Sequence, residues 1–292
     1  MLVAQYLAAN PPVLLTFAGL LGLAVGSFLN VVIHRLPKMM ESEWRSQCAE
    51  ILDDGAPAEK RATYNLVVPR SRCPGCDHQI TALENIPVLS YIVLRGRCSG
   101  CGQRIGLRYP LVELLTGLLS VLVVWRFGLT VQAGGALLLT WALVALSVID
   151  FDTQYLPDAI TLPFLWLGLA FNVAGVYTTT QASVIGAIVG YLTLWSVYHL
   201  FRLITGKEGM GYGDFKLLAL FGAWLGWSAV PVIVLLSSFV GAIVGIALIA
   251  LRGHDRNIPI PFGPYLAVAG WIALMWGDQL VEAYLGVSGL NQ

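Results

Sequence analysis

Four aspartates stand beside long apolar stretches, at positions where a charged group is costly. Asp150, Asp152 and Asp158 lie in a short polar segment between two apolar runs, and Asp214 precedes a third run. Ionisable residues at membrane depth usually serve a function. Two carboxylates held together could share a proton, so that one activates a water molecule while the other protonates a carbonyl or a leaving group. This is the chemistry of an aspartyl protease.

The local sequence distinguishes these aspartates from one another. Asp158 follows a proline and precedes an apolar run, which predicts an ordinary helix N-cap. Asp150 ends an apolar helix, where the helix dipole disfavours an anion by about 0.3–1 kcal/mol, so some other group must compensate this cost. Asp214 follows glycines at alternate positions, which give an open turn that a simple cap does not require. These features favour Asp150 and Asp214 as a pair, with a solvated helix end and a helix cap as their respective alternatives.

Four cysteines form two close pairs, Cys73-Pro-Gly-Cys76 and Cys98-Ser-Gly-Cys101. Four thiolates at this spacing suit a tetrahedral zinc ion, and the glycine-containing turns bring each pair around it. Because protein ligands would fill all four positions, the zinc would be structural rather than catalytic. Two disulfides or four free thiols are the alternative, and a cytosolic location disfavours the disulfides. Cys48 stands apart and is interpreted as an ordinary thiol.

Basic residues surround the cysteine pairs, and a basic zinc ribbon can bind nucleic acid. A position beside the cytoplasmic face of a membrane explains the same charges, because that face is rich in anionic headgroups. We therefore expect no nucleic-acid partner.

The composition places most of the chain in lipid. Of its 292 residues 57% are hydrophobic and only 12% are charged, and the mean hydropathy is +0.73. An average soluble domain carries roughly 25% charged residues. We therefore expect an all-α polytopic membrane protein, with the lipid bilayer as its surroundings.

Apolar runs of membrane-spanning length predict about eight transmembrane helices. The expected spans are 12–33, 111–126, 131–149, 159–177, 183–203, 215–230, 232–251 and 262–285. Since no Lys or Arg precedes Arg35, the first span lacks the basic start of a cleavable signal peptide and is expected to remain as an anchor.

The basic residues orient these spans, because cytoplasmic loops are enriched in Lys and Arg. With residues 35–109 in the cytoplasm, Arg126 is the single basic residue on the other side. Both termini are then periplasmic. We expect three parts: a first transmembrane segment at 1–34, a zinc-ribbon-like cytoplasmic insertion between the first and second spans at 35–109, and a multi-span peptidase domain at 110–292.

Six motifs, in order along nearly the whole chain, resemble those of the bacterial type IV prepilin peptidases. They are the run from Gly26 to Pro37, the two cysteine pairs, Glu84-Asn85-Ile86-Pro87, the segment Asp150–Asp158, Gly211-Tyr212-Gly213-Asp214 and Pro261-Phe262-Gly263-Pro264. The resemblance implies an aspartyl protease of the GxGD class in the bacterial inner membrane. It implies that Asp150 and Asp214 are the catalytic residues, with Asp152 as an alternative to Asp150 that spacing does not exclude.

The resemblance also implies substrates and a second activity. Members of this family cut prepilins and type II secretion pseudopilins after a glycine, between a short basic leader and a hydrophobic helix. Many relatives then methylate the new N-terminus with S-adenosylmethionine, and those that do usually carry the cysteine-bearing insertion. We expect both activities here, and we assign no residues to binding of the methyl donor.

Other functional classes explain fewer of these features. A transporter or channel could use the aspartates as an ion relay, but the expected spans hold few other polar groups and the acids gather at one face. A zinc-ribbon membrane anchor without catalysis leaves the position of Asp150 unexplained. A metalloprotease is excluded because the four histidines lack the spacing of a zinc-protease helix.

Overall fold

The computed structural model describes residues 2–51, 64–207, 209–252 and 261–288. Within these ranges the chain is helical and has no β-strand, only two isolated bridges. The predicted all-α fold is therefore confirmed. The chain divides into two compact units, Met1–Leu129 and Thr130–Gln292. Residues 52–63 of the predicted insertion lie outside the described ranges.

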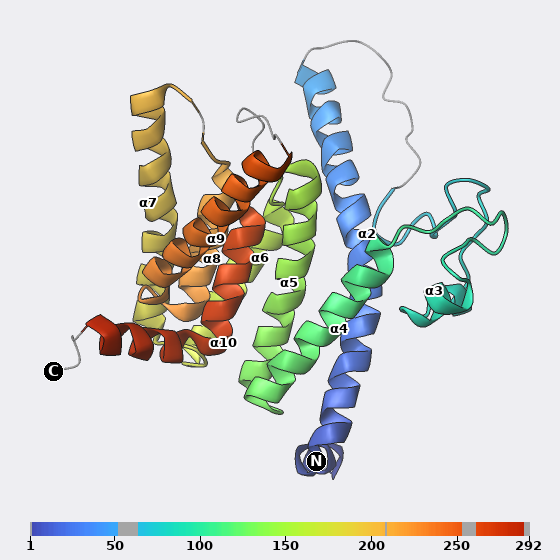
Figure 1. Cartoon of the computed structure of the whole chain (residues 1–292), viewed down its shortest axis with the longest axis horizontal. Helices are drawn as coiled ribbons and strands as arrows, with labels where there is room; N and C mark the ends of the chain where they lie inside the picture. The colour runs from blue at the N-terminus through green and yellow to red at the C-terminus, as the bar shows by residue number, and fades with distance from the viewer. Residues whose placement is uncertain (1, 52–63, 208, 253–260, 289–292) are drawn as a thin grey trace. The chain divides into compact units, whose positions relative to one another are not determined.

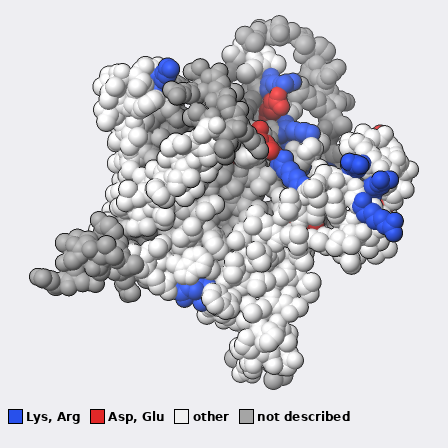
Figure 2. Space-filling model, in the orientation of Figure 1, with Lys and Arg blue, Asp and Glu red and all other residues white. Residues whose placement is uncertain are grey.

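The first unit is built on a pair of antiparallel helices, α2 (Pro11–Ile51) and α4 (Arg108–Phe127), which Figure 1 shows crossing side by side. The short α1 (Leu2–Ala9) precedes them. The chain between them holds the cysteine pairs, the short helix η1 (Leu83–Asn85) and α3 (Leu89–Val93). Few charged side chains show on the face drawn in Figure 2, and most of them gather over the C-terminal part of α2 and over the segment with the cysteines.

Small residues let α2 and α4 pack closely, and three contacts show which residues of the two helices face each other. Asn30 donates to the backbone oxygen of Tyr109 at 3.1 Å. One turn earlier, a Cβ added at Gly26 would lie 2.7 Å from the Cα of Glu113. One further turn away, a Cβ at Gly22 would lie 2.5 Å from the Ser120 hydroxyl. By these contacts α4 groups with α2, whereas the sequence analysis placed a domain boundary at residue 110.

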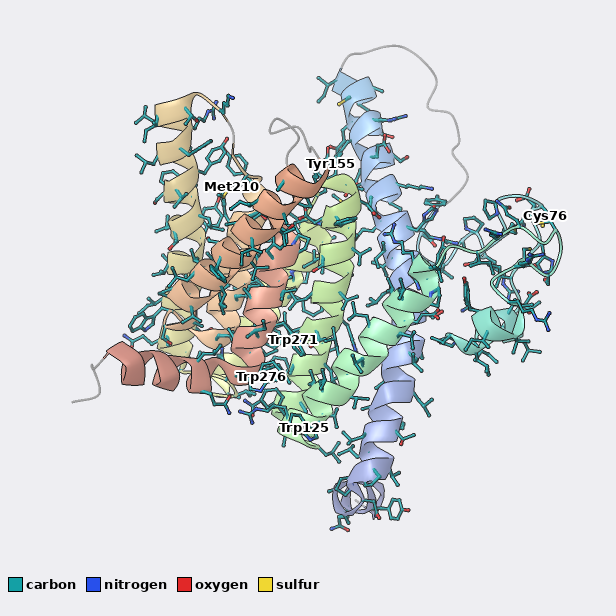
Figure 3. The ribbon with its side chains drawn as sticks, in the orientation of Figure 1. Cys76, Trp125, Tyr155, Met210, Trp271 and Trp276 are labelled. Atoms are coloured by element: carbon teal, nitrogen blue, oxygen red, sulfur yellow. The ribbon has the colours of Figure 1, made fainter. Side chains whose placement is uncertain are left out.

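The second unit is a bundle in which one short helix is the core. Its helices are α5 (Val131–Thr153), α6 (Asp158–Val173), α7 (Thr180–Thr205), α8 (Tyr212–Leu225), α9 (Ala229–Arg252) and α10 (Gly263–Ser288). Helix α8 packs against α6, α7, α9 and α10, and its residues from Leu217 to Trp224 are all buried. The backbone of α10 departs from helical geometry at Trp276, beyond which Figure 3 shows it running in a new direction.

Two kinds of contact hold α8 in place. A Cβ at Gly222 would lie 2.0 Å from the backbone oxygen of Gly186 on α7, so these two helices touch through their backbones. At the end of α8 the fully buried Asn172 donates to the backbone oxygens of Ala223 and Trp224 at 2.8 and 2.9 Å. The last carbonyls of a helix have no partner within it, so Asn172 satisfies groups that would otherwise be costly to bury.

Each of the eight predicted spans corresponds to one helix, but 159–177 extends beyond the end of α6, and 215–230 extends beyond α8 to the first residues of α9. Five helices in the described part of the chain are long and apolar enough to cross a membrane: α2, α4, α5, α7 and the Ala229–Ala247 part of α9. The apolar α6 is shorter, and α8 has 14 residues. The polytopic membrane character is thus supported, while the number of helices that cross stays a prediction.

The backbone contact between α7 and α8 gives a first test. We expect Gly222→Ala to lower the free energy of unfolding by about 1–3 kcal/mol, because the added methyl group overpacks the contact with Gly186. Thermal unfolding in detergent would measure the loss. The matched control is Gly134→Ala in α5, where nothing lies within 4 Å of the added carbon. Equal stability of both variants would contradict the close packing.

Candidate active site and metal site

Asp150 is buried near the C-terminal end of α5, with 5% of its surface exposed. Its Oδ2 accepts a hydrogen bond from the backbone N–H of Gly263 at 3.0 Å. The helix ends three residues later, where Gln154 adopts a left-handed conformation with φ of 57° and donates to the backbone oxygen of Asp150. The side chain therefore turns towards another helix rather than towards solvent.

Gly263 is the first residue of α10, and its position explains how a carboxylate is tolerated at the end of α5. The backbone oxygen of Phe262 accepts the first hydrogen bonds of α10, from Tyr265 and Leu266. The N–H of Gly263 therefore belongs to the free N-terminal donors of that helix, which attract anions. The N-terminus of α10 thus supplies the compensation that Asp150 requires.

Gly263 also needs to be a glycine. A Cβ at this residue would lie 2.6 Å from Oδ2 of Asp150 and 3.2 Å from Cδ1 of Leu156. The sequence analysis used Pro261-Phe262-Gly263-Pro264 as a family motif but gave it no role. The available signal was the unfavourable dipole at Asp150, which indicated that a partner existed without identifying it.

Asp214 lies in the first turn of α8 and is 6% exposed. Its Oδ2 accepts from the backbone N–H of Gly211 at 3.3 Å, while its own N–H donates to the backbone oxygen of Gly211 at 3.2 Å. The two residues form a reciprocal cap at the start of the helix. Asp214 is therefore not the cap residue itself, because Gly211 takes that position, but its carboxylate accepts from the N–H of the cap residue.

The two aspartates lie in the same part of the second unit, near enough to each other for electrostatic interaction. Leu156 bridges the surrounding backbone, because added Cβ atoms at Gly213 and Gly263 would lie 2.8 Å from its Cβ and 3.2 Å from its Cδ1. Figure 3 shows Tyr155, just after α5, and Met210, just before α8, at the same end of the bundle.

The other two aspartates differ from this pair. Asp152 is exposed, unlike Asp150. The prediction that Asp158 caps α6 is wrong, because Pro157 takes the cap position and Asp158 is the first helical residue. Both carboxylate oxygens of Asp158 instead accept from Lys216 Nζ at 2.7 Å. This ion pair joins α6 to α8 two residues after Asp214.

The four paired cysteines form a cluster in the first unit, with all sulfur atoms within 4.8 Å of one another. The Cys73 and Cys101 sulfurs are 3.8 Å apart, and those of Cys76 and Cys98 are 3.9 Å apart. A disulfide requires about 2.05 Å. Four sulfurs around a tetrahedral zinc with bonds of about 2.3 Å stand about 3.8 Å apart. The cluster therefore has the donor set and spacing of a zinc site.

The two cysteine turns have the same backbone design. In each turn the N–H of the first cysteine donates to the backbone oxygen of the residue five positions later. Cys73 donates to His78, and Cys98 donates to Gln103. Each also bends at a residue with positive φ, Asp77 at 55° and Gly102 at 72°. Figure 3 shows Cys76 at the tip of this region.

Glu84 links the two turns, which the sequence analysis did not foresee. Its carboxylate accepts from the Ser99 hydroxyl beside the second pair, from both the N–H and the hydroxyl of Thr81, and shares a hydrogen bond with His78 beside the first pair. These donors, Ser99 first, lower the pKa of Glu84 to about 2. The carboxylate therefore stays charged at neutral pH and holds the turns together.

Arg35 ties the same region to α2. Its side chain is buried, and its guanidinium donates to the backbone oxygens of Asn65 and Pro69 at 2.8 and 2.6 Å. It also lies over the Tyr64 ring, 5.6 Å from the centroid. The chain that leads into the first cysteine pair is thus fixed to the helix.

Comparisons with known proteins agree with this arrangement. Residues 20–127 match the model of the bacterial peptidase A24 N-terminal domain, and residues 137–246 match that of the type IV leader peptidase family. A Pseudomonas aeruginosa protein named prepilin leader peptidase/N-methyltransferase is 57% identical over 98% of this chain and 99% of its own length. A protein of the same name from Dichelobacter nodosus is 47% identical over 97% of this chain and 98% of its own length. No solved structure matches the chain significantly. With both family models matched and near-complete coverage of these relatives, the chain belongs to the type IV leader peptidase family.

Proposed function

We propose that this chain is a prepilin leader peptidase and N-methyltransferase of the bacterial inner membrane, with Asp150 and Asp214 as its catalytic residues. The observation that carries the proposal is the pairing of two buried aspartates, each bound through Oδ2 to the backbone N–H of a glycine at a helix start. Family membership and the shared name of relatives up to 58% identical support the activity.

The two carboxylates would work as a pair that shares one proton. The ionised aspartate takes a proton from a water molecule, whose oxygen attacks the scissile carbonyl carbon, and the protonated aspartate gives its proton to the carbonyl oxygen. Collapse of the resulting diol breaks the C–N bond: the aspartate that took the proton from water gives it to the departing nitrogen, and the other aspartate regains its proton from a hydroxyl of the diol. The hydrogen bonds to Gly263 and Gly211 hold Oδ2 of each side chain, so Oδ1 of each is the atom we assign to this chemistry.

The substrate class fits a site at the membrane surface. A prepilin or pseudopilin has a basic leader, which the positive-inside rule keeps in the cytoplasm, followed by a hydrophobic helix that lies in the bilayer. The scissile bond between them then arrives at the cytoplasmic face, where we place Asp150 and Asp214. This orientation gives both termini a periplasmic position and places the 35–109 insertion on the cytoplasmic side.

We assign the cysteine cluster a structural zinc ion, held by Cys73, Cys76, Cys98 and Cys101. Bound zinc would fix the two turns that Glu84 already joins. For N-methylation, S-adenosylmethionine would donate a methyl group to the amine that cleavage exposes. This second activity rests on the name of the relatives, and we assign it no residues.

Substitution of the two aspartates tests the mechanism. Asp150→Asn and Asp214→Asn should each abolish cleavage of a prepilin-like substrate in detergent, because an amide can neither take up nor supply the shared proton. Asp152→Asn is the matched control and should cut at a rate close to that of the native protein, since Asp152 is exposed. Metal content and thermal unfolding would confirm that each variant is folded. Loss of cleavage in Asp152→Asn alone would transfer the role to that residue.

Gly263→Ala tests the support of Asp150. The new methyl group would overlap Oδ2 of Asp150 and displace the carboxylate, and a displacement of about 1 Å can reduce a rate by about 10²-fold. We expect a fall of this order in kcat with little change in KM. Gly241→Ala in α9 meets only ordinary contacts of 3.5 Å or more and should be unaffected. Native kcat in Gly263→Ala would show that the contact is not needed.

Metal analysis tests the cysteine cluster. The purified native protein should contain one zinc per chain, and Cys73→Ser combined with Cys98→Ser should contain almost none, because two of the four thiolate ligands are lost. Cys48→Ser should keep the full amount, since Cys48 is exposed and is not part of the cluster. A zinc content well below one per native chain would count against the site.

A further inference from the structure

Residues 86–93, between the two cysteine pairs, expose an apolar face. Leu89, Ile92 and Val93 are 55%, 65% and 71% exposed, and Ile86 is 39% exposed. This segment includes the short helix α3 and lies within the stretch that the sequence analysis assigned wholly to the cytoplasm. A cytoplasmic surface would leave these side chains in water, which is unfavourable for a cluster of large apolar groups.

The segment lies beside the apolar part of α2. Ile86, Pro87, Val88, Leu89 and Ile92 line a groove together with Leu20, Leu23 and Ala24 of α2. The first charged residues of α2 come much later, at His34 and Arg35. The groove is therefore beside the apolar half of the helix and not beside its basic end.

The rise of the helix gives the depth of this contact. Leu23 precedes His34 by 11 residues, which at 1.5 Å per residue is about 16 Å along α2. On α4, Glu113 follows Arg108 by five residues, or about 8 Å. The hydrocarbon core of a bilayer is about 30 Å thick. Counted from His34 and Arg108 as its cytoplasmic edge, Glu113 lies within the cytoplasmic half of the core and Leu23 lies close to its midplane.

Glu113 fixes the segment at that depth. It is 9% exposed, and its Oε2 accepts from the backbone N–H of Val88 at 2.7 Å. Val88 has a φ of 61°, which is unusual for a β-branched residue and turns the chain back into α3. An unpaired backbone N–H in hydrocarbon costs several kcal/mol. The N–H of Val88 therefore needs the carboxylate of Glu113 as its acceptor. The buried carboxylate of Glu113 thus serves to satisfy this N–H and to hold the segment against the helices.

We propose that residues 86–93 enter the cytoplasmic leaflet of the membrane and that their exposed apolar side chains contact lipid acyl chains. Leu20 of α2, which lines the same groove, is also exposed, at 62%, so the apolar surface of the segment continues onto the helix. The cysteine cluster is then attached to the membrane through its own connecting segment, in addition to the two flanking helices. The inference depends on α2 crossing the membrane and not on the peptidase activity.

Spin labels in bilayers test this placement. Leu89→Cys and Ile92→Cys would be made in the zinc-loaded Cys48→Ser protein, labelled, and reconstituted into phospholipid vesicles, and the unsubstituted Cys48→Ser protein would give the background signal. Leu20→Cys is the reference for lipid and Glu43→Cys, exposed on the C-terminal part of α2, is the reference for water. Collision rates with oxygen and with a water-soluble nickel chelate would be measured at each position.

The expected result is a nickel collision rate at residues 89 and 92 at least about tenfold lower than at residue 43, with oxygen collisions as frequent as at residue 20, because a polar chelate is excluded from hydrocarbon. Nickel access like that of residue 43 would overturn the proposal. Exclusion of both reagents would also overturn it, since a second copy or another protein would then cover the face.

A second measurement uses the protein without substitutions. Lipids that carry a photoreactive group near the end of an acyl chain should label residues 86–93 and leave the peptide 39–45 of α2 unlabelled. The reverse pattern would refute the insertion even if the cysteine variants failed to fold. Since neither measurement uses cleavage, failure here would leave the proposed peptidase activity untouched.

Discussion

The site depends on one constraint: a buried carboxylate in an apolar helix bundle needs a hydrogen-bond donor that no other group in the protein requires. Asp150 finds it in the first N–H of α10, and Asp214 finds it in the N–H of Gly211 at the start of α8. Helix N-termini have such donors to spare and also carry partial positive charge. The two helix starts therefore do for the aspartates what water or a basic side chain would do at the surface of a soluble protein.

This solution determines much of the local sequence. A carboxylate can approach a backbone N–H closely only where no side chain intervenes, which requires glycine at residue 263. Gly213 similarly makes room for Leu156, which extends from the loop after α5. The polar segment after Asp150 and the glycine motif before Asp214 thus interlock, although 50 or more residues separate them along the chain.

Local patterns were sufficient to predict the helical fold, the positions of eight apolar helices and the grouping of the four cysteines. They also singled out Asp150 and Asp214, which the structure places within electrostatic reach of each other. Long-range partners were beyond such patterns. The hydrogen bond of Asp150 reaches across 113 positions to Gly263, and the ion pair of Asp158 was not foreseen because Lys216 is 58 positions away. Glu84 was noticed only as part of a motif, because its function depends on the folding of both cysteine turns.

The length of α8 has a consequence for how a peptide reaches the aspartates. A helix of 14 residues is about 21 Å long, or about 9 Å shorter than the hydrocarbon core of a bilayer. It can be this short because α6, α7, α9 and α10 surround it, so that protein rather than lipid meets the irregular chain at its ends. Under the proposed function, an aspartate at the start of such a helix would lie just inside the cytoplasmic face, below the headgroups. Hydrolysis there needs a hydrated depression in the protein, and the residues of the leader nearest the scissile bond must be extended enough to descend into it.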